Sequence, residues 1–296
     1  MTGKWSPIGP ENTVSISCLN ETLLGGQSFS WSSHSENHWI GVIGYSLVEL
    51  RWVNGQLQWR SSGFKPMSQK ELQHYLWLDH SFEEAIDTLP WRSDMVLSRA
   101  IHRFPKLRIL RQPLEETLLV FLLSSAKSIP QIKKLREKIY CLLGDKISPD
   151  VYAFPGWEKI KEVSEPEARK LGMGYRAKYV IGTANFLAEN PEFLSSLKLL
   201  SYEEARLKLM KLPGVGPKVA DCVLLFGGQK SEAFPIDTWI HQSLEKQYGL
   251  RGWKITQMEE FARIHFGKYA GLAQQFLFSY QRHFQKAENH KKVKFR

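Results

Sequence analysis

The chain has 296 residues, of which 43% are hydrophobic and 24% are charged, and this balance is typical of a globular protein with two or three compact domains. Its longest apolar runs, such as residues 118–123, are far too short to cross a bilayer, which excludes a membrane partner. The 40 Lys and Arg residues against 30 Asp and Glu give a formal charge of +10, which favours a polyanionic partner and above all nucleic acid.

The first third of the chain has the pattern of an antiparallel sheet. Over residues 14–64, apolar and polar residues alternate, and aromatic and β-branched residues are frequent. Asn54 and Gly55 lie between two such runs and predict a tight two-residue hairpin. We expect an antiparallel sheet domain with short helices over residues 1–105.

From about residue 68 the apolar period becomes helical. Residues 68–78 and 81–89 are expected to form short helices that open with a serine. Further helices, each bounded by Pro, Gly, Ser, Asp or Asn, are expected at 113–125, 130–144, 166–172, 176–190, 201–212, 217–227, 237–249 and 272–284. The fold class is therefore α+β, with a mainly helical region of two subdomains over residues 106–296.

No pattern of a secretion signal or of a cofactor site is present. The polar start lacks the charged and then apolar segments of a signal peptide, so we expect an intracellular protein, cytoplasmic and at the nucleoid if the source is prokaryotic. Cys18, Cys141 and Cys222 are odd in number and far apart, which fits neither a disulfide framework nor a zinc or iron–sulfur site. We predict no metal ligands and no cofactor.

Two amphipathic helices joined by a glycine turn form a motif at about residues 202–227. Gly214 and Gly216 can take positive φ and present bare N–H groups, and Pro217 suits the first position of the second helix. A loop that ends at a helix N-terminus in this way can bind a phosphate. The motif therefore predicts a helix–hairpin–helix that grips a nucleic-acid backbone, and a plain helix–turn–helix connection is the alternative.

Lys218 begins the second helix of this motif. The positive end of the helix dipole and partial desolvation both favour a neutral amine, which can attack carbon as a nucleophile. A lysine that only pairs with phosphate is the alternative. Asp237 closes the Pro-x-Asp segment 235–237, where its carboxylate can face Lys218 and assist the chemistry, or can serve only as the N-cap of the following helix.

Together these features resemble the helix–hairpin–helix DNA glycosylases with a Gly/Pro–Asp motif. Within that superfamily the chain is most similar to the 8-oxoguanine DNA glycosylases, and closer to a bacterial-type member than to the animal ones. The similar blocks, in the order of that family, are GGQSFSW at 25–31, LGMGYRAKYV at 171–180, SYEEA at 201–205, LPGVGPKVADC at 212–222 and YAGLAQQFLFS at 269–279. The resemblance covers about residues 20–284.

The resemblance implies a bifunctional glycosylase and abasic-site lyase that acts in base-excision repair. Lys218 would attack C1′ of the damaged nucleoside, displace the base and form a Schiff base that permits β-elimination, with Asp237 as the catalytic carboxylate. The implied partner is double-stranded DNA that contains 8-oxoguanine, and the enzyme is expected to act as a monomer.

The resemblance also implies a base pocket. The backbone carbonyl of Gly26 would accept a hydrogen bond from the N7–H that 8-oxoguanine has and guanine lacks. Cys222 and Phe278 would sandwich the flipped base, and Gln274 would read its Watson–Crick edge.

Further residues would contact the DNA around the lesion. Tyr175 would wedge beside the extruded nucleotide, and Arg176 would contact the base left behind. Trp239 stands where animal members have a histidine near the backbone. Ala126 and Gln131 replace an asparagine and an arginine of the animal pattern, which predicts weaker discrimination of the opposite base.

Three other functions are alternatives to this interpretation. A monofunctional alkylpurine DNA glycosylase needs no nucleophilic lysine, so Lys218 argues against it. A non-catalytic helix–hairpin–helix module leaves the pair of Lys218 and Asp237 unexplained. An RNA-binding sheet would need an aromatic pattern that the N-terminal strands lack.

Overall fold

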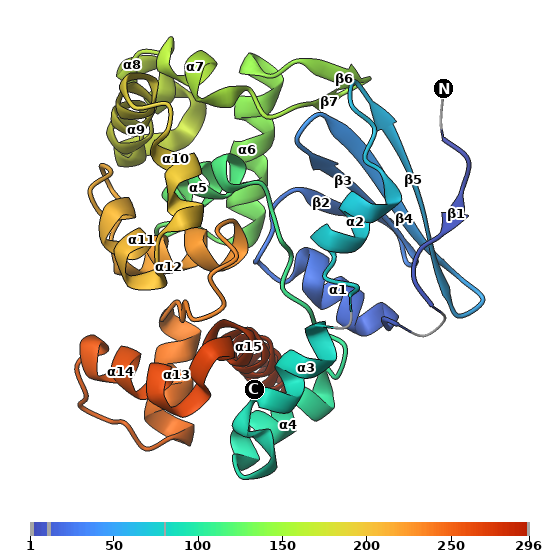
Figure 1. Ribbon diagram of the computed structural model, residues 1–296, viewed down its shortest axis with the longest axis vertical. Coiled ribbons are helices and arrows are strands. Elements are labelled where there is room, and N and C mark those ends of the chain that lie inside the picture. The colour runs from blue at the N-terminus through green and yellow to red at the C-terminus, as the bar shows by residue number, and fades with distance from the viewer. Residues whose placement is uncertain (1–2, 11–12, 80, 295–296) are drawn as a thin grey trace.

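A computed structural model describes residues 3–10, 13–79 and 81–294, and shows an antiparallel sheet on one side of a large helical region (Figure 1). The sheet has five strands in the order β1-β5-β4-β3-β2, as expected for the N-terminal part. The strands are β1 (Ser6–Pro7), β2 (Trp31–Ser35), β3 (His38–Ile43), β4 (Ser46–Val53) and β5 (Gln56–Gly63). Two helices, α1 (Ile16–Leu24) and α2 (Gln69–Tyr75), share the buried core of the sheet.

The predicted hairpin at Asn54 and Gly55 is confirmed. Both residues have positive φ, 49° and 81°, and they connect β4 to β5, whose Val53 and Gln56 are paired. This backbone twist matches the twist of the flanking strands, which is why Asn-Gly favours the turn.

The expectation of sheet over all of residues 14–64 is wrong at its start, where the chain forms α1. The side chain of Ser15 accepts a hydrogen bond from the N–H of Cys18 and caps this helix. Leu19 and Leu23, four residues apart, point into the core on one face. The short polar–apolar alternation at 14–17 imitated a strand, but the residues after it have the helical period.

The helical region contains every helix that was expected from residue 113 onward. Its α-helices are α3 (Ser81–Thr88), α4 (Met95–Arg103), α5 (Leu114–Leu123), α6 (Ile129–Leu143), α7 (Gly156–Lys161), α8 (Glu165–Ala168), α9 (Ala177–Glu189), α10 (Phe193–Ser196), α11 (Tyr202–Leu209), α12 (Pro217–Phe226), α13 (Thr238–Gln247), α14 (Ile255–Phe266) and α15 (Ala270–Lys294). A small hairpin, β6 (Lys146–Ser148) and β7 (Val151–Tyr152), and the helices α4, α7, α10 and α14 were not predicted. Short helical turns are η1 (Pro90–Arg92), η2 (Arg169–Met173), η3 (Gly174–Arg176), η4 (Leu197–Leu199) and η5 (Gly267–Tyr269).

The buried apolar residues form two cores. The smaller core lies between the sheet, α1 and α2, and the larger core joins the helices. Although α3 and α4 precede residue 105, their side chains Phe82, Leu97 and Ile101 belong to the larger core, and α4 packs against α15 (Figure 1). The division into residues 1–105 and 106–296 stays a prediction, and packing groups residues 81–104 with the helical region.

Candidate active site

The hairpin between α11 and α12 turns on a glycine that packs tightly. Gly214 has φ of 77°, and an added Cβ would collide with the ring of Tyr179 on α9. Gly216 does not use its freedom to take positive φ, because its φ is −92° and it is the N-cap of α12 in an extended conformation. A Cβ on Gly216 would meet no atom within 4 Å, so its surroundings leave the start of α12 open to an approaching group.

Lys218 lies in the first turn of α12 and is half-buried, with its Nζ 5.8 Å from the ring centre of Phe121. Asp237 is the N-cap of α13, where its carboxylate accepts a hydrogen bond from the N–H of Ile240 at 2.9 Å. Burial raises the pKa of Asp237, and the hydrogen bond from Ile240 and the charge of Lys218 act in the opposite direction. The two predicted groups are therefore within electrostatic reach of each other.

Both groups line one cavity of about 540 Å³, a volume in the range of small-ligand sites. The cavity is bordered by the loop after α1, the end of α5, the loop before α6, α12, the Pro235–Trp239 segment and α15. The sequence-predicted residues that it brings together are Gly26, Lys218, Cys222, Asp237, Trp239, Gln274 and Phe278. A second, wider cavity of about 990 Å³ also includes Lys218, Asp237 and Trp239, and continues along α13.

The walls of the first cavity include the four residues that were predicted to contact the base, Gly26, Cys222, Gln274 and Phe278. Gly26 has φ of 110°, and a Cβ there would stand 2.8 Å from Cδ1 of Ile129. Cys222 is only 4% exposed, and burial raises the pKa of its thiol to about 12, so the sulfur is neutral at pH 7. Phe278 is half-buried and leaves part of its ring free to stack.

Gln274 lines the cavity and has a buried acceptor atom without a partner in the described part of the chain. Its Nε2 donates to the carbonyl of Pro235 at 3.1 Å, while its Oε1 is buried and has no hydrogen-bond partner among the described residues. Buried polar atoms are normally paired, so an unpaired one in a cavity wall indicates a ligand that donates to it.

Tyr175 and Arg176 lie outside both cavities, in η3. The ring of Tyr175 is 48% exposed and lies edge-on to Tyr179. The guanidinium of Arg176 is buried against it, 4.3 Å from the ring centre, and donates to the carbonyl of Met173 at 3.4 Å. Their expected contacts with the duplex stay predictions, and a base contact would require Arg176 to leave this position.

Of the two departures from the animal pattern, Ala126 lies in the loop before α6 and Gln131 in the first turn of α6. Ala126 has φ of 51°, a conformation that asparagine and glycine tolerate better than alanine. The side chain of Gln131 accepts a hydrogen bond from the N–H of Ser128 at 2.8 Å and caps α6. Gln131 thus has a local structural role at the start of α6.

The cavity also contains residues that sequence reasoning missed. Phe121 and Phe226 stack on each other with ring centres 5.5 Å apart, and Lys127 lines both cavities. Arg282 lies 5.7 Å from the ring of Phe278 and donates to the buried carboxylate of Glu21. The two phenylalanines occur in ordinary apolar helices and carry no separate signal, whereas Lys127 stands in a loop that the sequence had already marked.

Within the described part of the chain, no group of three or more His, Cys, Asp or Glu side chains is arranged to hold a metal ion. The helices that the structure describes include none with the length and apolarity required to cross a bilayer.

Known proteins match this chain over almost its entire length. The family described as 8-oxoguanine DNA glycosylase, N-terminal domain, matches residues 11–118. The N-glycosylase/DNA lyase OGG1 of Arabidopsis thaliana is 36% identical over 94% of this chain and 80% of that protein. The N-glycosylase/DNA lyase of Saccharomyces cerevisiae is 31% identical over 78% of this chain and 68% of that protein.

A solved structure extends the similarity to the fold. The 8-oxoguanine glycosylase/lyase of Clostridium acetobutylicum, in complex with DNA that has cytosine opposite 8-oxoguanine, superposes with a TM-score of 0.86. It is 29% identical, and the match covers 96% of this chain and 98% of that chain. With the sequence match to the plant relative, the shared fold shows that this chain belongs to the family of 8-oxoguanine DNA glycosylases.

Proposed function

We propose that the protein flips 8-oxoguanine out of duplex DNA, excises it and then cleaves the resulting abasic site. The observation that carries this proposal is the single cavity in which Lys218, Asp237 and the candidate base-contacting residues meet. Family membership supports the same activity, since the matched relatives are named as N-glycosylases and DNA lyases. If the cell is prokaryotic, the enzyme acts on DNA at the nucleoid.

The chemistry follows from an amine beside a carboxylate. The lone pair of Lys218 Nζ forms a bond to C1′ while the bond from C1′ to the base breaks, and the base leaves with the bonding electrons. Loss of protons from the nitrogen and opening of the sugar give an imine, which makes the C2′ hydrogen acidic and permits β-elimination of the 3′ phosphate. Asp237 stabilises the positive charge that develops on the sugar.

Recognition of the lesion uses the walls of the cavity. The carbonyl of Gly26 accepts a hydrogen bond from N7–H of 8-oxoguanine, and guanine, which has no hydrogen there, leaves this group unpaired at a cost of about 1–3 kcal/mol. The free Oε1 of Gln274 accepts from the donor groups of the Watson–Crick edge. Cys222 and Phe278 hold the two faces of the base.

We also propose that the enzyme discriminates only weakly between bases opposite the lesion. Ala126 cannot fill the space left by the lesion as an asparagine would, and Gln131 is engaged in capping α6. We expect comparable single-turnover excision of 8-oxoguanine opposite cytosine and opposite adenine. A strong preference for cytosine would contradict this assignment.

Borohydride trapping tests the proposed function directly. The protein is incubated with a duplex that carries one 8-oxoguanine opposite cytosine, and borohydride reduces any imine to a stable adduct that denaturing electrophoresis resolves. We expect an adduct with the parent protein, none with Lys218→Gln, and a strongly reduced yield with Asp237→Asn.

Other outcomes would indicate the alternative functions. Release of the base without an adduct would point to water as the nucleophile, as in a monofunctional glycosylase. Binding without release or adduct would leave a module that only grips DNA, and the role of Lys218 would be wrong.

A further inference from the structure

Gln27, the residue that follows Gly26, forms hydrogen bonds through both polar atoms of its side chain. Gln27 is only 1% exposed. Its Nε2 donates to the carbonyl of Arg108 at 2.8 Å, and its Oε1 accepts from the N–H of Leu110 at 2.8 Å. A glutamine that bridges two backbone groups more than 80 positions away fixes the relative position of both segments.

A second glutamine completes the connection to the helix of the nucleophile. Nε2 of Gln112 donates to the backbone carbonyl of Gln27 at 2.6 Å. The backbone N–H of Gln112 donates to the carbonyl of Phe226 at 2.8 Å. Phe226 is the last residue of α12, which carries Lys218, so residues 107–112 link the base-contacting loop to the catalytic helix. We name residues 107–112 the strap.

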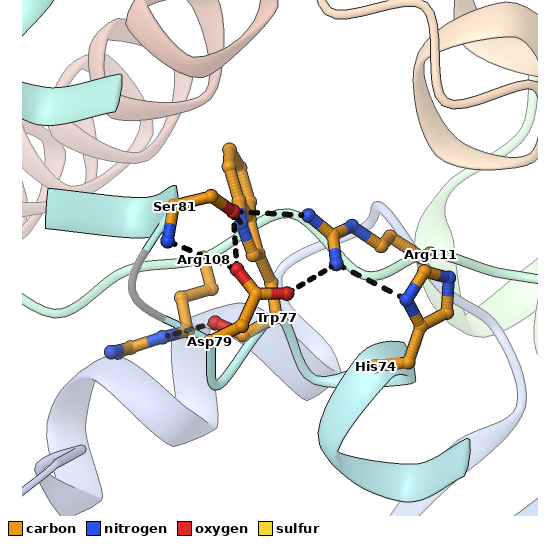
Figure 2. A network of polar contacts seen from close by, with 6 residues as sticks. All are labelled: His74, Trp77, Asp79, Ser81, Arg108 and Arg111. Carbon is orange, nitrogen blue, oxygen red and sulfur yellow. Dashed lines mark hydrogen bonds and ion pairs between the residues drawn. The ribbon is translucent and has the colours of Figure 1, made fainter. Parts of the chain in front are cut away.

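The strap is itself anchored to the segment after α2, as Figure 2 shows. Nε of the buried Arg108 donates to the carbonyl of Trp77 at 3.0 Å. Arg111 donates to the carboxylate of Asp79 at 2.8 Å and lies 3.3 Å from Nδ1 of His74. The side chains of Arg108 and Arg111 point to opposite sides of this segment in Figure 2, so the strap is held from both sides.

Gly26 needs such support because a glycine backbone can adopt many conformations. A glycine with φ of 110° has no Cβ to restrict it, and a carbonyl that must distinguish one hydrogen atom has to be held within about 0.5 Å of its productive position. The carbonyl of Gly26 belongs to the peptide unit that ends at the N–H of Gln27. Anchoring Gln27 at its side chain and at its carbonyl therefore restricts this unit from its C-terminal side.

We propose that Gln27 and Gln112 are positioning residues for lesion recognition, acting through the strap to hold the carbonyl of Gly26 at a fixed place relative to Lys218. This inference rests on the proposed function, in which that carbonyl reads the N7–H of the lesion. The inference predicts different effects on two activities of the enzyme, base excision and abasic-site cleavage. Excision of 8-oxoguanine needs the positioned carbonyl, whereas cleavage of a preformed abasic site needs Lys218 but has no base to read.

The test is Gln112→Met, which keeps the size of the side chain and the backbone bond to Phe226 but removes the donor to Gln27. Single-turnover rates are measured on a duplex with 8-oxoguanine and on one with a preformed abasic site. We expect excision to fall about tenfold or more, as for the loss of one buried hydrogen bond, while abasic-site cleavage stays within about twofold of the parent. The matched control is Gln281→Met, another buried glutamine with one side-chain hydrogen bond, to Gln247 on α13, and we expect it to change neither rate.

Gln112→Glu provides a second readout that a purely structural role would not produce. An ionised carboxylate would repel the carbonyl of Gln27, whereas the protonated acid regains an O–H donor, and burial favours the protonated form. We expect the excision rate of this variant, divided by that of the parent at the same pH, to recover as the pH falls from 8 to 5.5. A constant ratio would argue against the hydrogen bond as the cause.

Two outcomes would overturn the inference. Excision by Gln112→Met at the parent rate would show that the strap does not position the carbonyl. Parallel loss of both activities, together with a lowered unfolding temperature, would show that Gln112 only supports the fold. The parent reports on the proposed function in the same assay, because failure of the parent to release 8-oxoguanine would overturn that function itself.

Discussion

At the scale of the residue, Asp237 shows how one side chain serves structure and chemistry together. It caps α13 by accepting from the N–H of Ile240, and it lines the cavity that contains Lys218. The sequence left open whether it was only a cap. In the structure the same carboxylate caps α13 and lines the cavity, so the cap fixes the group to which the proposed chemistry assigns a role.

The raised pKa of Asp237 predicts the acidic limb of the pH profile. The carboxylate must be ionised to stabilise a cationic sugar, and burial shifts its protonation to a higher pH than that of an ordinary aspartate. We expect the single-turnover excision rate to fall as the pH is lowered. This fall should begin at a pH above about 4, near which an ordinary aspartate becomes protonated. Asp237→Asn should retain the cap, change the free energy of unfolding by less than about 1 kcal/mol and reduce excision at least about 100-fold. A normal excision rate in this variant would contradict the assigned role.

At the scale of the element, the helix–hairpin–helix uses its two glycines for different purposes. Gly214 has positive φ and packs against the ring of Tyr179, whereas Gly216 is extended with no neighbour near its Cβ position. The first glycine is required by the turn, and the second leaves the N-terminus of α12 accessible to a phosphate.

Alanine substitutions should separate these purposes. Gly214→Ala introduces both backbone strain and a collision with Tyr179, and we expect it to lower the free energy of unfolding by about 2–3 kcal/mol, measured in urea. Gly216→Ala should change stability by less than about 0.5 kcal/mol and weaken duplex binding about tenfold, because the methyl group blocks close approach. Equal effects of the two substitutions on stability would contradict this division.

A buried ion pair between Arg206 and Asp221 joins α11 to α12. Asp221 is 1% exposed and accepts hydrogen bonds from Tyr202 and Arg206, each at 2.8 Å, and Arg206 also pairs with Glu259 on α14 at 2.6 Å. Burial raises the pKa of Asp221 to about 6 despite these partners. The pair therefore holds the catalytic helix in place and makes its stability depend on pH.

Arg206→Met should lower the free energy of unfolding most at neutral and higher pH. A folded-state pKa above the unfolded value means that stability is greatest with the carboxyl protonated and falls as the pH rises through about 6. Without Arg206 the buried charge of Asp221 lacks its main partner. We therefore expect the free energy of unfolding, measured in urea, to fall by about 3 kcal/mol at pH 7.5 and by less at pH 5. The control Arg263→Met removes an exposed pair with Glu260 and should leave the free energy of unfolding close to that of the parent at both pH values. An equal loss at both pH values would contradict the ionisation argument.

At the scale of the whole molecule, the formal charge of +10 agrees with a DNA partner, and the two cavities share Lys218 and Trp239 in their walls. Lys127 lines both cavities, in the loop between α5 and α6. We expect its amine to contact a phosphate beside the flipped nucleotide.

Salt dependence measures this contact. The logarithm of the association constant for duplex DNA should fall linearly with the logarithm of the salt concentration, and Lys127→Ala should reduce the magnitude of that slope by about 1. Lys70→Ala, on α2 and outside both cavities, should leave the slope unchanged. Equal slopes for the parent and Lys127→Ala would exclude the contact.

Local features of the sequence predicted much of this protein. The Asn54–Gly55 hairpin, eight of the helices after residue 113, the glycine turn and the cap at Asp237 follow from turn chemistry, helical period and capping, which act over a few residues. The same local reasoning failed at α1, where a brief alternation imitated a strand, and it missed α4, α7, α10 and α14.

By itself, the sequence determined the chemical groups, namely an amine after a glycine turn, a carboxylate after a proline and a glycine-rich block near the start. Only the tertiary structure decided that these groups share one cavity, that Tyr175 and Arg176 lie outside it, and that the strap ties Gln27 to α12. The reason is physical. Periods and caps are set by neighbours along the chain, whereas distances between segments 80 or more residues apart are set by the packing of the whole core.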